Sequence, residues 1–246
     1  MREHRLYHNQ PIATGQTITL DANTSKRIRQ VLRLKPGQTL SVFDGSGNDY
    51  MAELTRCAKQ AVQIRVGACI RHETPPALKL QLALGITRGE KMDYSLQKAV
   101  ELGVMTIIPL FTQRTLVQLQ GQKLYRRQAH WQGVIQHACE QTGRSILPEQ
   151  QPAQTLTEWL AQHPSNDTQA LLLDPHAEQT LTRLPRPDNN PVLVLVGPEG
   201  GLASTERTAA LQQGFTPVRL GPRILRTETA PLAALAAIQT LWGDYG

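Results

Sequence analysis

Two patterns of hydrophobic and polar positions divide the chain. Up to about residue 70, apolar and polar residues alternate along Gln38–Phe43, Tyr50–Leu54 and Ala61–Val66, as they do in half-buried β-strands. The turn-forming segment Asp44–Asn48 separates the first two of these strands. Short strands hide their edges most economically in a small barrel, so we expect an N-terminal β-barrel over residues 1–72.

A second feature of this part is a basic segment. Ser25–Leu34 is predicted to form a short helix that stops at Lys35-Pro36-Gly37. Cations in and around it suit contact with a phosphate backbone, although such a run is more often a solvated face. The candidate RNA-binding residues here are Arg2, Arg5, Lys26, Arg27, Arg33 and Lys35.

Residues 73–77 are the best domain boundary, because Pro75 and Pro76 enforce an extended linker. From Leu78 onward, strands alternate with helices over residues 78–246, which predicts an α/β domain with a parallel sheet covered on both faces. The predicted strands are Lys79–Ile86, Thr106–Phe111, Ala170–Leu173, Val192–Val196 and Val218–Leu220. The predicted helices are Lys91–Val104, His130–Thr142, one opening at Thr155 with Glu158 in a capping box, Ala203–Gln213 and Ala230–Trp242.

Composition narrows the class of protein. The chain has 246 residues, 40% of them hydrophobic, which is enough for a substantial core. Its net charge of +6 fits a polyanionic partner such as nucleic acid, with a merely basic soluble protein as the even alternative. The widely spaced Cys57, Cys69 and Cys139 have no metal-ligand spacing and read as reduced thiols. Without a signal peptide or membrane-length apolar run, we expect a cytoplasmic protein that uses no membrane and no metal.

Several common cofactor signatures are absent. Gly85-Ile86-Thr87-Arg88-Gly89 follows the first strand of the α/β part, where a dinucleotide-binding fold would carry GxGxxG. The sequence also lacks a Walker A motif, HExxH and GxSxG. Dinucleotide, nucleoside triphosphate, zinc-protease and α/β-hydrolase functions are therefore disfavoured.

Two Gly/Pro loops near the C-terminus carry the strongest functional signal. One is Gly197-Pro198-Glu199-Gly200-Gly201, directly after an apolar strand, and the other runs from Leu220 to Ala230. Glycines let the backbone approach a ligand and aim N–H groups at it, although either loop alone could be just a tight turn. Two strands of one sheet would deliver both loops to a single crevice.

Charged side chains flank this predicted crevice. Glu199 is the acid of the first loop and could accept a proton or a hydrogen bond, or be an exposed turn residue. Arg223, Arg226 and Glu228 lie in the second loop. An arginine there could hold a phosphate or stabilise an anionic base, and the alternative is a solvated side chain.

The combined motifs resemble a known family. Leu195–Gly201, then Glu206, then Leu220–Ala230 are similar to the SPOUT methyltransferases, and within them to the ribosomal small-subunit RNA methyltransferase E family. Further matching segments, in the same order along the chain as in that family, are Val31–Gly37, Gln97–Val104 and Glu140–Arg144.

The resemblance implies a PUA-like RNA-binding barrel followed by a SPOUT domain with a C-terminal trefoil knot. It implies a homodimer that methylates N3 of one uridine in the decoding region of 16S rRNA, within the small ribosomal subunit. The methyl donor, S-adenosylmethionine, would be bound by Leu172, Leu173, Val196, Gly197, Pro198, Glu199, Gly200, Gly201, Leu220, Gly221, Ile224, Leu225, Arg226 and Thr229. Arg144 and Arg223 would join the RNA-binding set.

Uridine N3 is protonated at neutral pH, so the enzyme must remove that proton or stabilise the resulting anion. We hypothesise that Arg226, with Arg88 or Arg114, stabilises the anion, and that Glu199 is a weaker candidate for the proton acceptor. Alternative functions are a non-enzymatic RNA-binding or ribosome-assembly protein, an enzyme of another nucleotide cofactor, and a SPOUT methyltransferase acting at another RNA site.

Overall fold

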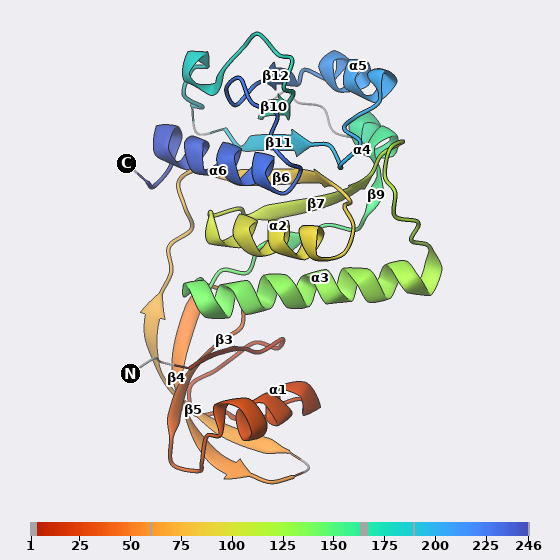
Figure 1. Ribbon diagram of the computed structural model, residues 1–246. Helices are drawn as coiled ribbons and strands as arrows, with labels where there is room; N and C mark the ends of the chain where they lie inside the picture. Colours follow the sequence, from red (N-terminus) through yellow and green to blue (C-terminus); the bar gives the residue numbers. More distant parts are fainter. Residues whose placement is uncertain (1–3, 60, 163–166, 189, 246) are drawn as a thin grey trace. The chain divides into compact units, whose positions relative to one another are not determined.

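The chain divides between Pro75 and Pro76 in the computed structural model, which describes residues 4–59, 61–162, 167–188 and 190–245 (Figure 1). Unit 1 comprises the chain up to Pro75 together with Cys139–Leu147, and unit 2 comprises the remainder. The hydrophobic pattern did not anticipate that Cys139–Leu147 would group with unit 1. Backbone pairing between Ser46 and Ile146, and side-chain bonds such as Arg5 to the Cys139 carbonyl, join these distant segments, and periodicity does not record such contacts.

Unit 1 is built on a five-stranded sheet with the strand order β1-β3-β4-β5-β2. Only the β1–β3 pair is parallel among its pairings. The three predicted strands are present, with longer β4 and β5, whereas β1 and β2 are too short for a periodic pattern to reveal them. The strands are β1 Arg5–Tyr7, β2 Thr17–Thr19, β3 Thr39–Phe43, β4 Asn48–Cys57 and β5 Val62–His72.

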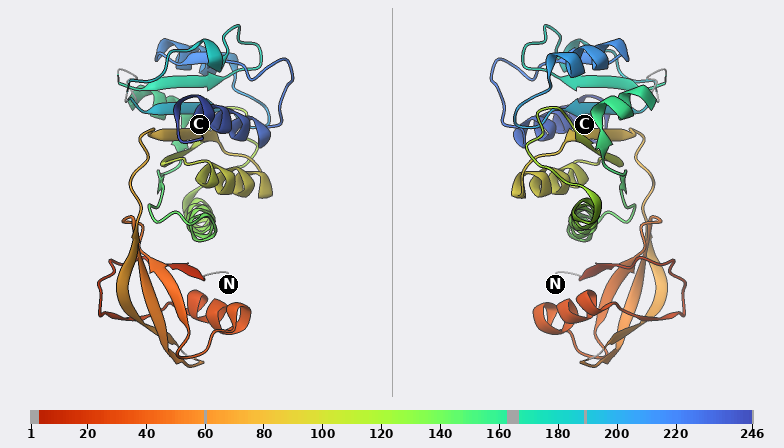
Figure 2. Two further views of the ribbon diagram at one scale, coloured as in Figure 1. Left: turned by 90° about the vertical axis from the view of Figure 1, so that its left-hand side faces the viewer. Right: turned by 90° about the vertical axis from the view of Figure 1, so that its right-hand side faces the viewer.

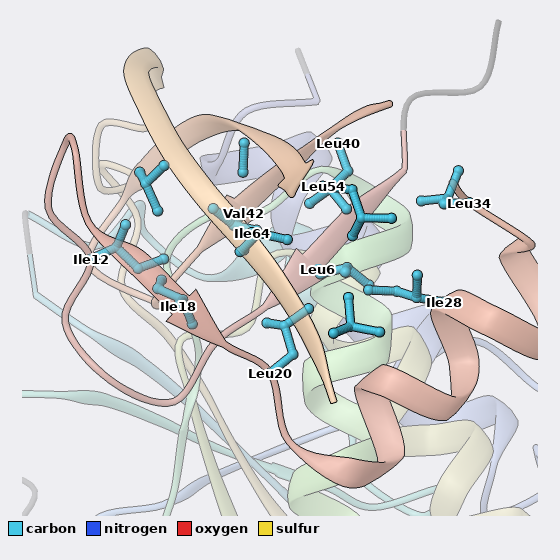
Figure 3. Packing of buried hydrophobic residues seen from close by; sticks show 13 residues of the cluster. Leu6, Ile12, Ile18, Leu20, Ile28, Leu34, Leu40, Val42, Leu54 and Ile64 are labelled. Atoms are coloured by element: carbon cyan, nitrogen blue, oxygen red, sulfur yellow. The ribbon is translucent and has the colours of Figure 1, made fainter. Parts of the chain in front are cut away.

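The core of unit 1 forms because alternate strand residues point to the same side of the sheet. Leu40 and Val42 from β3, Leu54 from β4 and Ile64 from β5 pack together in Figure 3. Ile28 packs against them from the neighbouring helical segment and is fully buried. This burial fixes the helical segment on the sheet.

The basic segment is helical, but its bounds differ from the prediction. Helix α1 spans Ala22–Arg27 and continues as a short π-helix, Ile28–Leu32. It starts early because Asp21 caps it, accepting hydrogen bonds from the N–H groups of Asn23 and Thr24. It stops at Arg33, which has φ = 54° and so cannot continue a right-handed helix.

Unit 2 contains a seven-stranded sheet in which every pairing is parallel, as predicted. The strand order is β12-β10-β11-β6-β7-β8, and β9 also pairs with β7. β12 lies two residues before the predicted strand Val218–Leu220 and includes Pro217, which is tolerated at a sheet edge. The strands are β6 Leu80–Gly85, β7 Thr106–Phe111, β8 Glu149–Gln150, β9 Gln154–Thr155, β10 Gln169–Leu173, β11 Val192–Val196 and β12 Thr216–Val218.

Helices cover both faces of this sheet (Figures 1 and 2). α2 and α6 pack together on one face, and α4 and α5 lie on the other. Leu193 and Leu195 of β11 pack with Trp159 of α4 and with Phe215 after α5. The helices are α2 Glu90–Glu101, α3 Gly121–Thr142, α4 Leu156–Gln162, the 3₁₀ turn Leu181–Arg183, α5 Ser204–Gln212 and α6 Thr229–Trp242.

Candidate functional site

A cavity of about 420 Å³ lies in unit 2 beyond the carboxyl ends of β10, β11 and β12. Parallel α/β sheets commonly bind ligands at this edge, in cavities of roughly 300–1,000 Å³. The strand end Leu172-Leu173 and both Gly/Pro loops contribute to its wall. The lining includes Arg114, Asp174, His176, Val196, Gly197, Pro198, Glu199, Gly201, Leu202, Arg207, Leu220, Arg223, Ile224, Leu225 and Thr227.

The first loop is closely packed at Gly197 and against Gly85. A Cβ atom on Gly197 would lie 3.1 Å from the backbone of Gly201 and Leu202. A Cβ atom on Gly85, at the end of β6, would lie 2.6 Å from the nitrogen of Pro198. The N–H of Gly201 donates to the carbonyl of Pro198 at 2.8 Å. The loop is therefore held in a defined shape, and it presents glycine backbone together with the Pro198 and Glu199 side chains to the cavity.

A buried carboxylate ties the segment after β7 to this loop. Glu206 in α5 is 4% exposed and accepts hydrogen bonds from the N–H groups of Ala203 at 2.9 Å and Gln113 at 2.8 Å. Beside Gln113, the Arg114 guanidinium donates to the carbonyl of Gly200 at 2.9 Å. This arrangement places Arg114 on the cavity wall.

The second loop is more exposed. Gly221 adopts φ = 91°, a conformation that favours glycine, and Ile224 lines the cavity while 78% exposed. The carbonyl of Arg226 accepts hydrogen bonds from Thr229 and Ala230 at the start of α6, each at 2.9 Å. Among the predicted site residues, Arg88, Gly200, Gly221, Arg226 and Thr229 are not part of the cavity lining within the described chain.

An ionic contact joins the two loops. The Lys91 ammonium at the start of α2 lies 3.8 Å from the Glu199 carboxylate and 3.6 Å from the Glu228 carboxylate. Glu199 also accepts a 3.4 Å hydrogen bond from the backbone N–H of Arg88. The sequence predictions did not place Lys91 among the site residues, because nothing in its local pattern distinguishes it from a solvated helix residue.

Asp174 and Arg207 are further cavity residues that the sequence predictions missed. Asp174 follows β10 and is 8% exposed. Its carboxylate accepts hydrogen bonds from the His176 N–H at 2.8 Å and from Arg207 Nε at 2.7 Å. Burial raises the pKa of Asp174, but these hydrogen bonds and the arginine charge outweigh it and hold the pKa below its usual value. An acid directly after a buried strand was the available sequence signal.

The basic residues predicted to bind RNA have different surroundings. The Arg5 side chain is 11% exposed and bonds to the Asp49 carboxylate at 2.6 Å and the Cys139 carbonyl at 2.9 Å, all within unit 1. Because its guanidinium is taken up by the protein, we no longer expect Arg5 to contact RNA. Arg27 pairs with Glu140 and remains partly exposed. Arg2 lies outside the described residues.

The other predicted RNA-binding residues differ in exposure. Lys26, Arg33 and Lys35 of unit 1 are exposed, as is Arg223 of unit 2. Arg144 is partly buried in unit 1, where its carbonyl accepts a bond from Arg5.

The described part of the chain also bears on metals and membranes. It contains no group of three or more His, Cys, Asp or Glu side chains arranged to hold a metal ion. Within the same residues, no helix is both long enough and apolar enough to cross a membrane.

Known proteins resemble the chain over its full length. Residues 74–239 match the RNA methyltransferase domain family, and residues 25–67 match the RNA methyltransferase PUA domain family. Ribosomal RNA small subunit methyltransferase E of Buchnera aphidicola subsp. Schizaphis graminum is 33% identical over 98% of this chain and 97% of its own length.

Solved structures agree with these matches. Ribosomal RNA small subunit methyltransferase E from Neisseria gonorrhoeae, bound to S-adenosyl methionine, shares 36% identity with a TM-score of 0.90 and covers 100% of both chains. A methyltransferase from Legionella pneumophila, in complex with the same cofactor, shares 33% identity with a TM-score of 0.92 over 99% of this chain and 100% of the other.

Proposed function

Because the chain belongs to the RNA methyltransferase family, and within it to the ribosomal RNA small subunit methyltransferase E proteins, we propose that it transfers a methyl group from S-adenosylmethionine to N3 of one uridine in the decoding region of 16S rRNA. The observation that best supports this function is the cavity at the strand ends, which both Gly/Pro loops line. Its position and size suit a nucleoside-containing methyl donor.

The residues around the cavity fit that donor. Leu172, Ile224 and Leu225 supply apolar surface for a base and ribose, and the glycine loop supplies backbone groups for their polar edges. A Cβ atom at Gly197 would press on the backbone of Gly201 and Leu202, so glycine keeps this wall close-packed. We assign Gly200, Gly221, Arg226 and Thr229 to the support of these walls, because they do not line the cavity themselves.

When bound, S-adenosylmethionine supplies an electrophilic methyl group. The protein must then place uridine N3 in line with that group and stabilise the anion left by loss of its proton. Arg114 is the best placed of the three proposed arginines, since it lines the cavity and is held by the Gly200 carbonyl. Arg226 and Arg88 are exposed and can reach the anion only from outside the lining.

Glu199 is the proposed proton acceptor. It lines the cavity, and both the Lys91 ammonium and the Arg88 N–H orient its carboxylate. Its alternative role is to bind the methyl donor. Glu199→Gln separates the two roles. Loss of a proton acceptor lowers kcat, whereas loss of a contact to S-adenosylmethionine raises the KM for S-adenosylmethionine.

RNA is the proposed partner of both units. Lys26, Arg33 and Lys35 in unit 1, with Arg27 and Arg144, would contact the phosphate backbone, which suits a domain that matches RNA methyltransferase PUA domains. Arg223 would contact RNA at the cavity. We further propose a cytoplasmic homodimer with a trefoil-knotted C-terminal part that acts on the small ribosomal subunit.

The test is methyl transfer to defined RNA. Small subunits from cells lacking this protein are incubated with the purified protein and labelled S-adenosylmethionine, and the 16S rRNA is mapped by mass spectrometry. We expect one N3-methyluridine in the decoding region. Label at another nucleotide would overturn the site assignment, and absence of transfer to both subunits and free rRNA would overturn the proposed function.

A further inference from the structure

An ion pair between Asp174 and Arg207 lies on the cavity wall where β10 ends. The Asp174 carboxylate receives Arg207 Nε at 2.7 Å and the His176 N–H at 2.8 Å. Asp174 and Arg207 both line the cavity. They come from different elements, the β10 end and α5, and meet only through folding.

The pair keeps unused hydrogen-bonding capacity on both sides. Arg207 contacts Asp174 through Nε, which leaves its two terminal amino groups without a partner in the described chain. A carboxylate has about four acceptor positions, so Asp174 retains positions beyond the two in use. The wall thus offers a donor group of positive charge beside an acceptor group of negative charge.

We propose that the Asp174–Arg207 pair binds the zwitterionic amino-acid end of the methyl donor, with Arg207 taking its carboxylate and Asp174 its ammonium group. This inference rests on the proposed function and names a part of its donor site. A guanidinium binds a carboxylate through charge-assisted hydrogen bonds, and the Asp174 contact orients that guanidinium in advance.

The charge pattern favours this ligand over an RNA phosphate. A phosphate carries only negative charge, so it would gain from Arg207 but be repelled by the adjoining Asp174 carboxylate. A zwitterion gains from both side chains. The low exposure of Asp174 strengthens the discrimination, because its charge is poorly screened by solvent.

Calorimetric binding of two adenosine thioethers tests the inference. S-adenosylhomocysteine carries the amino-acid end, whereas 5′-methylthioadenosine has the same nucleoside and sulfur without it. For Arg207→Ala, we expect the affinity for S-adenosylhomocysteine to fall roughly 10- to 100-fold, with that for 5′-methylthioadenosine unchanged. Asp174→Asn should weaken the first ligand about 10-fold, again selectively, and Arg207→Lys should restore part of the loss.

Arg183→Ala is the matched control, since Arg183 is exposed in the 3₁₀ turn and does not line the cavity. It should bind both ligands like the wild type. The inference fails if the Arg207 and Asp174 variants lose both ligands equally or lose neither, or if they lose only affinity for a 16S rRNA fragment. Should Arg207→Ala not fold, Arg207→Lys and Asp174→Asn decide. A wild-type protein that binds neither thioether would contradict the proposed function instead.

Discussion

The two loops that wall the cavity are built differently. In Gly197–Gly201, backbone packs on backbone, and the buried Glu206 anchors the adjoining segment. In the second loop, residues 221–224 are all exposed, and Ile224 leaves 78% of its surface uncovered. The first loop is therefore formed without a ligand, whereas the second has apolar surface that a ligand would cover. Stability should depend on the first loop and affinity on the second.

Glycine replacements should show the largest difference in stability between the two loops. In Gly85→Ala, the new Cβ would meet Pro198 of the first loop at 2.6 Å, so the backbone must shift, and we expect a loss of about 3 kcal/mol in the free energy of unfolding. Gly221→Ala meets no atom within 4 Å and costs only left-handed strain, about 1 kcal/mol. Urea unfolding followed by tryptophan fluorescence reports on unit 2, which contains all three tryptophans. Equal losses of unfolding free energy in the two variants would contradict the proposed difference between the loops.

Removing the anchor of the first loop should have the next largest effect. Glu206→Ala leaves the N–H groups of Ala203 and Gln113 without their acceptor, which should cost about 2 kcal/mol in unfolding free energy. Glu206→Gln keeps an acceptor oxygen and should cost less. The same fluorescence measurement compares them, and an alanine variant as stable as the wild type would remove Glu206 from the account.

The second loop should respond in binding and not in stability. Ile224→Ala removes an apolar side chain that the protein leaves exposed on the cavity wall, so the affinity for S-adenosylhomocysteine should fall about 10-fold. The unfolding midpoint should not move. Calorimetry and thermal unfolding check the two expectations, and a lower midpoint with unchanged affinity would reverse the proposed roles of the loops.

The smallest effect concerns pH. Folding lowers the pKa of Asp174 below its value in the unfolded chain. The ionised carboxylate therefore stabilises the folded protein at a pH above the unfolded-state pKa, and this stabilisation is lost as the pH falls through the folded-state pKa. Asp174→Asn should be less stable than the wild type at pH 7 by less than about 1 kcal/mol, and this gap should close toward pH 3. Urea unfolding at both values measures it, and a gap that widens in acid would contradict the assigned sign.

The sequence predicted the local structure around the cavity. Five consecutive apolar residues, Val192–Val196, marked a buried strand, and the Gly/Pro loop after it reached the cavity. The pattern could not predict Arg207 or Lys91, because each gains its role from a partner far away in the chain. The contacts of Arg5 were hidden for the same reason, and a three-residue strand such as β1 is too short for periodicity to detect.

Hydrogen exchange of the two loops, with and without S-adenosylhomocysteine, tests the central claim most directly, namely that both loops wall one methyl-donor site. The Gly201 amide, already bonded to the Pro198 carbonyl, should exchange slowly in both states, and the other amides of residues 197–202 that face the ligand should gain protection on binding. Amides of residues 221–229 should exchange fast in the free protein and become protected on binding. Protection of neither loop on binding, at a saturating ligand concentration, would contradict the account.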